Sequence, residues 1–440
     1  MRAFLASSIG VACAAALALP SAVPAGAAPG VPGGASDVAG STQSLPMSPL
    51  SAPSGRATGV PTRTAGPAEQ GLTEREVRPF SLAGVVWDDA GTELHGSVQV
   101  RTRARATARW SDWQDLETHN AEHGADPGTA ERESGTVRGS TAPLWVGPSD
   151  GVAVRVRPDT TDPRDRTAPA VPLPTGLRLE LVDPGKDPQQ LPAAGAEAGG
   201  DGGDGRTAPL DPSVLPALTK AETEARGEEE VRLAPGSRPY IGPRPRVITR
   251  KGWGADEKLR ERAFVYTKTV KAAFIHHSAT GNNYSCSQAP SVLRGIYRYH
   301  VKSSGWRDIG YNFAVDRCGN IYEGRAGGVT KAVLGAHTLG FNTNSTGIAV
   351  LGTFTRTNPP AAAVNAVAKL TAWKLGLYGA DPRGRTTLVS GGGNKFKKGR
   401  KVRLNVISGH RDGFVTECPG ARLYKKLGTA RTGSARLQGR

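Results

Sequence analysis

Phe274–Thr280 (FIHHSAT) and Gly409–Gly420 (GHRDGFVTECPG) are the two stretches of sequence that decide the fold of this chain. The first completes an apolar run that is typical of a buried strand, and the second follows another such run at 401–408. Each run therefore ends by placing a histidine, His276 or His410, at or just beyond a strand end. Ordered positions of this kind are where proteins usually fix metal ligands.

Cys418 lies eight residues after His410, so a short loop can bring its thiolate back toward the imidazoles. Two neutral imidazoles and one thiolate are a sufficient set for zinc with a fourth position left open, and an open position is typical of hydrolytic zinc. His277 competes with His276. Neighbouring side chains of a strand point to opposite faces, so only one of them can bind, and we predict His276.

A hydrolytic metal site also needs a group that stabilises the oxyanion or moves protons. Tyr311 is the leading candidate, because Asp308–Phe313 brings its phenol to the start of a predicted strand. A tyrosine in such a strand is more often a core residue. Thr416, two residues before Cys418, can offer a hydroxyl to the same oxygen.

The four cysteines divide by position. Cys13 falls in the apolar N-terminal stretch, which leaves an odd number in the remaining chain, and an odd thiol in an oxidising compartment is either reactive or binds something. If Cys418 is a metal ligand, Cys286 and Cys318 are free to form a disulfide. The alternative is that Cys418 is buried and inert.

The N-terminus has the pattern of a secretory signal. Arg2 precedes the apolar stretch Phe4–Leu19, and Ala25–Ala27 offers a small-residue cleavage site. The apolar stretch is shorter than the roughly 20 residues of a membrane span. We expect removal of residues 1–27, no transmembrane segment elsewhere, and a protein that is secreted or located at the cell wall.

Composition divides the rest of the chain into alternating folded and flexible parts. Alternating apolar residues, as in Val152–Arg157 and Leu177–Leu181, predict a small all-β sandwich. Segments rich in Pro, Gly and Ser cannot bury a core. The expected boundaries are 28–78 for a disordered linker, 79–184 for the β-sandwich domain, 185–243 for a flexible linker, 244–428 for the main domain and 429–440 for a basic tail.

The sandwich contains four tryptophans, Trp87, Trp110, Trp113 and Trp145, which are either core residues or a platform for stacking sugars. The linker at 185–243 is acidic and glycine-rich, which is typical of an extended tether, although 217–226 has the composition of a short helix.

The main domain is predicted to be α/β, with a mixed β-sheet flanked by helices. The order of its periodic segments carries this prediction. The expected strands are 269–276, 311–316, 321–324, 345–354 and 401–408, and the expected helices are 291–303, a long one after Pro359-Pro360, and 421–427.

The net charge of +17 is distributed unevenly. Residues 1–240 hold 22 Lys and Arg against 30 Asp and Glu, whereas residues 241–440 hold 34 against 9. Such a field concentrates polyanions near the C-terminal half, either nucleic acid or an anionic cell wall. A nucleic-acid partner is not expected, because no recognition helix or aromatic-basic interleaving is present. The basic stretch Lys395–Lys401 either binds anionic wall polymers or is a solvated hairpin.

Seven stretches, collinear over about 170 residues, resemble the peptidoglycan recognition protein family, which is related to phage-type zinc N-acetylmuramoyl-L-alanine amidases. They are Trp253–Asp256, Phe274–Thr280, Gly305–Phe313, Tyr322–Arg325, Gly335–Thr338 with Phe341–Asn342, Gly347–Ile348 and Gly409–Gly420. The N-terminal half is not covered, although a β-domain before such an amidase resembles secreted bacterial homologues.

The resemblance implies a role for several residues. It maps the zinc ligands onto His276, His410 and Cys418 and the catalytic tyrosine onto Tyr311, and Thr416 resembles the catalytic members, whereas the phage branch carries Lys there. The resemblance further implies a substrate groove lined by His337, Asn342, Arg325 and Trp306.

The implied function is a secreted zinc amidase that cuts the bond between N-acetylmuramic acid and L-alanine of peptidoglycan, acting as a monomer. The alternative is a peptidoglycan-binding recognition module without turnover. Such members usually lack the cysteine ligand, so Cys418 favours the enzyme. The family dipeptide that correlates with the third stem residue is replaced here by Ala326–Gly328, so a preference for diaminopimelate or lysine does not carry over.

Overall fold

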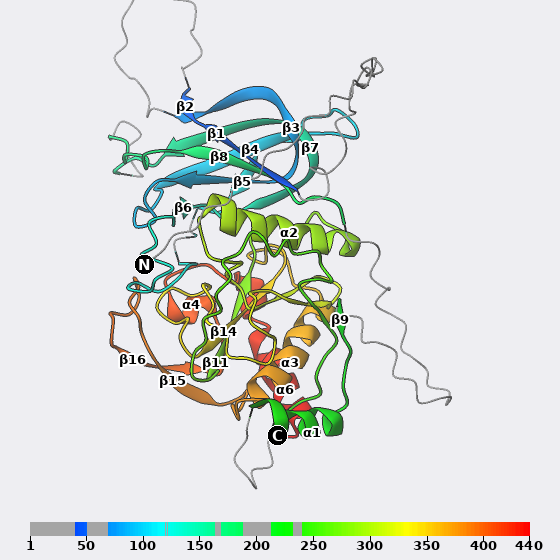
Figure 1. The fold of residues 1–440 in the computed structure, drawn as a ribbon. Helices are drawn as coiled ribbons and strands as arrows, with labels where there is room; N and C mark the ends of the chain where they lie inside the picture. The colour runs from blue at the N-terminus through cyan, green and yellow to red at the C-terminus, as the bar shows by residue number, and fades with distance from the viewer. Residues whose placement is uncertain are drawn as a thin grey trace, which may run out of the picture. The chain divides into compact units, whose positions relative to one another are not determined.

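The computed structural model describes residues 40–50, 69–118, 120, 122–162, 169–187, 213–231 and 240–440. All of them belong to one unit, residues 36–440, whose strands form three sheets (Figure 1). The expected signal segment, residues 1–27, lies outside the described residues. No helix among the described residues is long and apolar enough to cross a membrane.

The N-terminal half is an all-β domain, as predicted. Its strands pair in the order β1-β8-β3-β7-β4-β5, with β2 and β6 also paired to β3. Val152, Val154 and Val156 pack into a hydrophobic core whose members all belong to the β-domain. The apolar alternation at 152–157 therefore marks a strand, as predicted. The strands are β1 (Ser41–Pro46), β2 (Ser48–Pro49), β3 (Gln70–Trp87), β4 (Gly96–Ala104), β5 (Gln114–Leu116), β6 (Gly139–Ser140), β7 (Leu144–Pro158) and β8 (Arg178–Asp183).

Strands β1 and β2 and the start of β3 lie in the stretch expected to be a linker, 28–78. Strand β1 pairs with β8 over its six residues, and β3 begins at Gln70. A strand at a sheet edge gains its hydrogen bonds from a partner distant in sequence, and only Leu45 of β1 packs on the core. A short strand with so few apolar residues resembles a loop in its composition.

The four tryptophans do not form a common platform. Trp87 and Trp145 are core side chains, 1% and 5% exposed. Trp110 and Trp113 lie against Arg101, whose guanidinium carbon is 5.4 Å and 5.2 Å from the two rings. Of the two alternatives, core placement is confirmed for Trp87 and Trp145, and a sugar platform built from all four tryptophans is excluded because these two are buried.

The C-terminal half contains the predicted mixed sheet, in the order β17-β11-β14-β12-β13-β10-β9. Strands β17, β11, β14 and β12 run parallel, whereas β13 is antiparallel to β12. The strands are β9 (Val214–Leu215), β10 (Val247–Ile248), β11 (Ala272–His277), β12 (Phe313–Val315), β13 (Ile321–Glu323), β14 (Ser345–Val350) and β17 (Ile407–Gly409), and a separate hairpin joins β15 (Arg385–Val389) to β16 (Lys401–Asn405).

Helices cover both faces of this sheet. Helices α3 and α6 share a core with one face, and α2 shares a core with the other face and with Leu82, Val86, Trp145 and Val182 of the β-domain. The helices are α1 (Lys220–Val231), α2 (Ala289–Arg298), α3 (Ala361–Gly376), α4 (His410–Gly413), α5 (Ala421–Tyr424) and α6 (Leu427–Gln438), with a 3-10 turn η1 (Cys286–Gln288) and a π-helical turn η2 (Tyr299–Ser303).

The expected strand 401–408 is wrong as a single element. Its first part, β16, pairs with β15, and its last part, β17, joins the main sheet beside β11. The chain passes from one sheet to the other at Val406. Apolar residues continue across this point, with Val406 and Ile407 both buried in the main core, so the sequence shows no break.

The segment expected as a basic tail, 429–440, is largely helix α6. Leu427, Ala430, Ser434, Ala435 and Gln438 are buried. These positions recur at helical spacing on one face, and their mostly small side chains suit close packing on α3. Likewise β9 and α1 form within the predicted linker 185–243, where the sequence had indicated a short helix.

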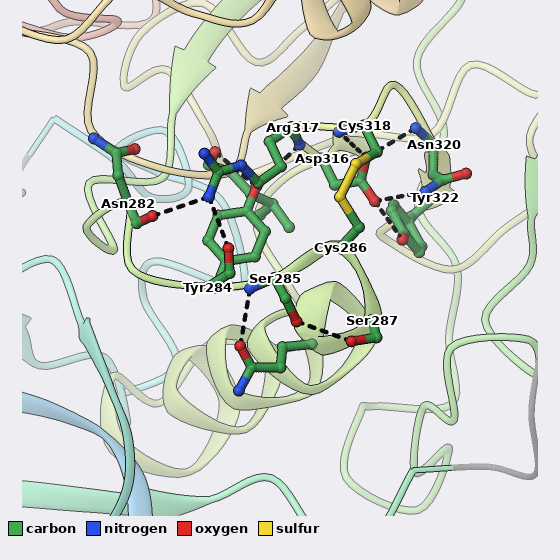
Figure 2. The surroundings of a disulfide bond; sticks show 12 residues. Asn282, Tyr284, Ser285, Cys286, Ser287, Asp316, Arg317, Cys318, Asn320 and Tyr322 are labelled. Atoms are coloured by element: carbon green, nitrogen blue, oxygen red, sulfur yellow. Dashed lines mark hydrogen bonds between the residues drawn. A yellow bond between two sulfur atoms is a disulfide. The ribbon is translucent and has the colours of Figure 1, made fainter.

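Cys286 and Cys318 form the predicted disulfide (Figure 2), with their Cα atoms 6.1 Å apart. Cys318 lies in the turn between β12 and β13, and the carboxylate of Asp316 organises that turn by accepting hydrogen bonds from the backbone N–H groups of Cys318 and Asn320, both at 2.9 Å. The bond therefore ties the start of α2 to the hairpin that follows Tyr311.

Candidate metal and active site

The sheet brings His276 and His410 together. Strands β11 and β17 are parallel neighbours in which Ile275 pairs with Gly409, so the residues that follow this pair are both histidines, His276 on β11 and His410 at the start of α4. Cys418 returns to the same place through a loop in which the backbone N–H of Arg411 donates to the carbonyl of Cys418 at 3.0 Å. The predicted convergence of the three side chains is confirmed.

The three candidate ligands share their position with a fourth side chain, His123 of the β-domain. One ligand atom from each of His123, His276, His410 and Cys418 lies within 4.8 Å of the others, and all four side chains are buried. The sulfur of Cys418 is 3.7 Å from Nδ1 of His276. His123 was not predicted from the sequence, because it lies in the loop between β5 and β6, where no motif or periodic pattern marks it.

The donor set fits a zinc ion. Both ring nitrogens of His410, and both of His123, are buried without a hydrogen-bond partner in the described structure. Buried polar atoms are nearly always paired, so imidazoles of this kind indicate a partner such as a metal ion. Tetrahedral sites built from imidazole and thiolate are typical of zinc.

Electrostatics favours neutral imidazoles at this position. Burial, reinforced by the neighbouring imidazoles, lowers the pKa of His276 and of His410 well below the ordinary value. Burial raises the pKa of the Cys418 thiol well above its usual range. A coordinated cation favours the thiolate, so metal binding and ionisation of Cys418 are coupled.

The side chains of His276 and His277 point to opposite faces of the sheet, and only one of them points toward the cluster. His277 points away from the cluster, where its Nδ1 accepts a hydrogen bond from the backbone N–H of Phe354 at 3.3 Å. His276 directs Nδ1 toward Cys418, and its Nε2 lies 3.3 Å from Nδ1 of His337. Of these two histidines, only His276 can serve as a ligand with His410 and Cys418.

Tyr311 lies beside the cluster, as predicted. Its ring centroid is 5.5 Å from that of His276, and the side chain is 5% exposed. Burial, together with Cys418 and Glu122, raises the pKa of Tyr311 well above its ordinary value. The phenol is therefore protonated at neutral pH and can donate a hydrogen bond.

Thr416 also lies at the site. Its Oγ1 accepts a hydrogen bond from the backbone N–H of Cys418 at 3.1 Å and donates one to Glu122 at 2.6 Å. Its hydroxyl is therefore engaged by the β-domain. Burial raises the pKa of Glu122 to about 8.

The four residues expected to line a groove are all buried. His337 is fully buried behind His276, and Trp306 stacks on His300 with ring centroids 4.3 Å apart. Arg325 and Asn342 are paired with carboxylates of the β-domain, Glu131 and Asp126 respectively.

Comparison with known proteins assigns the two halves separately. A family profile described as N-acetylmuramoyl-L-alanine amidase matches residues 266–421, and one described as Rv3811 N-terminal galactose-binding domain-like matches residues 33–173. Peptidoglycan-recognition protein SC2 of Drosophila melanogaster is 34% identical over 185 residues, which are 42% of this chain and 85% of that protein. The chain belongs to the peptidoglycan-recognition protein family.

Further relatives are similar over the same half of the chain. N-acetylmuramoyl-L-alanine amidase of Homo sapiens is 30% identical over 188 residues, 42% of this chain and 28% of that protein. The solved structure of peptidoglycan recognition protein-LE in complex with tracheal cytotoxin is 31% identical and covers 42% of this chain and 92% of that chain, with a TM-score of 0.33.

Proposed function

We propose that this protein is a secreted, zinc-dependent N-acetylmuramoyl-L-alanine amidase, which hydrolyses the amide between N-acetylmuramic acid and L-alanine of peptidoglycan. One observation carries the proposal: His276, His410 and Cys418 offer ligand atoms at one buried point, with the phenol of Tyr311 beside them. Membership of the peptidoglycan-recognition family supports peptidoglycan as the substrate class, and the similarity to an amidase supports amide hydrolysis as the reaction.

Each residue has a chemical task in this reaction. Zinc, when bound, supplies a Lewis acid and a water nucleophile at neutral pH. His276, His410 and Cys418 would hold the ion, and His337 would fix the ring of His276 from behind, as groups that hydrogen-bond to ligands do. Tyr311 donates a hydrogen bond to the amide oxygen as that atom gains negative charge, and the hydroxyl of Thr416 can reach the same oxygen once it is free of Glu122.

A recognition module without turnover is the alternative. Substrate binding alone requires neither a thiolate ligand nor a buried phenol beside it. The chain has both, Cys418 and Tyr311, and this combination supports the enzyme.

Secretion belongs to the same proposal. The N-terminal apolar stretch Phe4–Leu19 and the small-residue site before Pro29 support export, and export would bring the protein to its polymer substrate. Peptidoglycan is thus the proposed partner, with a monomer as the proposed state.

The test is digestion of purified peptidoglycan by the full-length chain, with new N-terminal L-alanine as the readout. We expect release by the wild type that is lost with a chelator, restored by zinc, and absent in Cys418→Ser. The control is His95→Ala, which changes an exposed histidine of the β-domain. Binding of the polymer without any release, in the wild type and in every variant described below, would support the recognition module instead.

A further inference from the structure

The loop between β5 and β6 reaches from the β-domain into the proposed active site. We call residues 122–138 the bridging segment. Residues 122–126 are all buried, although they form no helix or strand. Loops normally run over the protein surface, because buried backbone groups need partners. A buried loop of polar and small residues therefore requires an explanation.

His123 lies among the three candidate ligands, where its imidazole could supply a fourth. Its ring centroid lies 4.6 Å from that of His410 and 5.3 Å from that of His276. Neither of its ring nitrogens has a hydrogen-bond partner in the described structure. An imidazole with two unsatisfied nitrogens, buried among three metal-binding side chains, has the geometry of a fourth ligand.

Carboxylates of the bridging segment pair with the residues assigned to substrate binding. Glu131 forms a bidentate ion pair with Arg325, with both N–H···O distances 2.8 Å and both side chains less than 9% exposed. Asp126 accepts a hydrogen bond from the side-chain amide of Asn342 at 2.6 Å. Both partners would otherwise be available to the carboxylates and amides of a peptide.

Backbone contacts hold the segment at both ends. The carbonyl of Glu122 accepts a hydrogen bond from the backbone N–H of Leu339 at 2.8 Å, and the N–H of Arg138 donates to the carbonyl of Ser304 at 3.0 Å. Glu122 also accepts the hydrogen bond from Thr416. The segment therefore contacts the metal-binding, catalytic and groove residues at the same time.

We infer that the chain folds as a latent enzyme, in which His123 is a fourth protein ligand of the metal and residues 122–131 fill the groove in place of the peptide. The inference rests on the proposed function. Four protein ligands are typical of zinc sites without hydrolytic activity. Hydrolysis therefore requires the bridging segment to withdraw, which opens one coordination position and frees Thr416, Arg325 and Asn342 together.

The ligand assignment is tested on the full-length chain loaded with cobalt(II), whose visible spectrum reports the ligand set. We expect azide to leave the spectrum of the wild type and of His95→Ala unchanged and to shift that of His123→Ala. In His123→Cys the thiolate-to-cobalt absorption should roughly double, because two thiolates replace one. A wild type that responds to azide as His123→Ala does, or a His123→Cys variant with the absorption of one thiolate, overturns the assignment.

Latency is tested by the release of N-terminal L-alanine from peptidoglycan. If the open state holds about 10% of the molecules, full opening raises the rate about tenfold, and His123→Ala and Glu131→Gln should each raise the rate toward that limit. Glu133→Gln, at an exposed position of the same segment, should leave it unchanged. Equal rates in the wild type and in both variants overturn latency and leave the amidase proposal intact. No release from any variant refutes the amidase proposal, while the cobalt spectra still decide the role of His123.

Discussion

At the residue scale, His276 shows how one side chain is fixed for its task. Its Nδ1 faces the sulfur of Cys418, and its Nε2 faces His337, which in turn lies 3.0 Å from the hydroxyl of Thr338. Gly347 makes room for this arrangement, since a Cβ there would lie 2.3 Å from the ring of His337. The ring of His276 is thus held by a buried polar chain rather than by the metal alone.

Tyr311→Phe separates catalysis from metal binding. Removing the hydroxyl should lower kcat about 100- to 1,000-fold, as expected for loss of one oxyanion donor, while the zinc content stays that of the parent protein. The measurement is best made in the His123→Ala background, where the site is open. Tyr266→Phe, which changes a half-exposed tyrosine, serves as the control. Loss of zinc in Tyr311→Phe would instead assign the phenol a structural role.

Sequence reasoning reached the residues of the main site but not those of the bridging segment. His276 was separable from His277 because side chains alternate along a strand, and Cys418 was separable because an odd thiol needs a role. His123 follows no periodic segment, and its burial results from docking between parts distant in sequence. The sequence offered one indication: His123 lies between Glu122 and Asp126 in an acidic segment, and the other half of the chain is basic, so the two could attract each other.

At the element scale, helix α3 contains an unusual buried cation. Lys374 donates hydrogen bonds to the carbonyls of Val329 and Lys331, both at 2.7 Å, and is 2% exposed. Burial lowers the pKa of Lys374 to about 7. The unfolded chain keeps the ordinary lysine pKa of about 10.4, so between these two values the unfolded state binds one more proton than the folded state.

The free energy of unfolding should therefore rise with pH above about 7. Between pH 7 and pH 9 this lysine should add about 2 kcal/mol, since each pH unit in the window is worth about 1.4 kcal/mol at most. Denaturant midpoints of the wild type and of Lys374→Met give the measurement, and Lys369→Met changes an exposed lysine of the same helix as a control. A pH dependence that Lys374→Met shares with the wild type would contradict the prediction.

Elements with strong local signals were predictable, and elements defined by distant partners were not. Helix α3 follows two prolines, and the β12–β13 hairpin has turn residues at Arg317–Asn320, so local chemistry specified both. Strand β1 depends on β8, more than 130 residues away, and the break between β16 and β17 depends on which sheet each part joins. Helix α6 was hidden because its buried face consists mainly of small residues.

At the scale of the whole molecule, the C-terminal half carries a large excess of basic residues. The stretch Lys395–Lys401 covers the end of the loop that joins β15 to β16 and the first residue of β16, and its charged side chains are exposed. The stretch is therefore part of an exposed hairpin, which was one of the two alternatives for it. Exposed charges of this kind add little to folding stability and act mainly on approach and retention of charged partners.

Retention on isolated cell walls should accordingly depend on salt. The Debye length falls from about 10 Å at 0.1 M salt to about 3 Å at 1 M, so retention should drop steeply over that range. Neutralising Lys397, Lys398 and Arg400 to Gln should remove most of this dependence. Neutralising three other exposed cations, Arg422, Lys425 and Lys426, lowers the net charge equally and should matter much less if the hairpin is the contact. Equal losses of retention in the two triple variants would mean that overall charge, rather than this hairpin, holds the protein on the wall. Retention that does not change with salt would exclude an electrostatic contact.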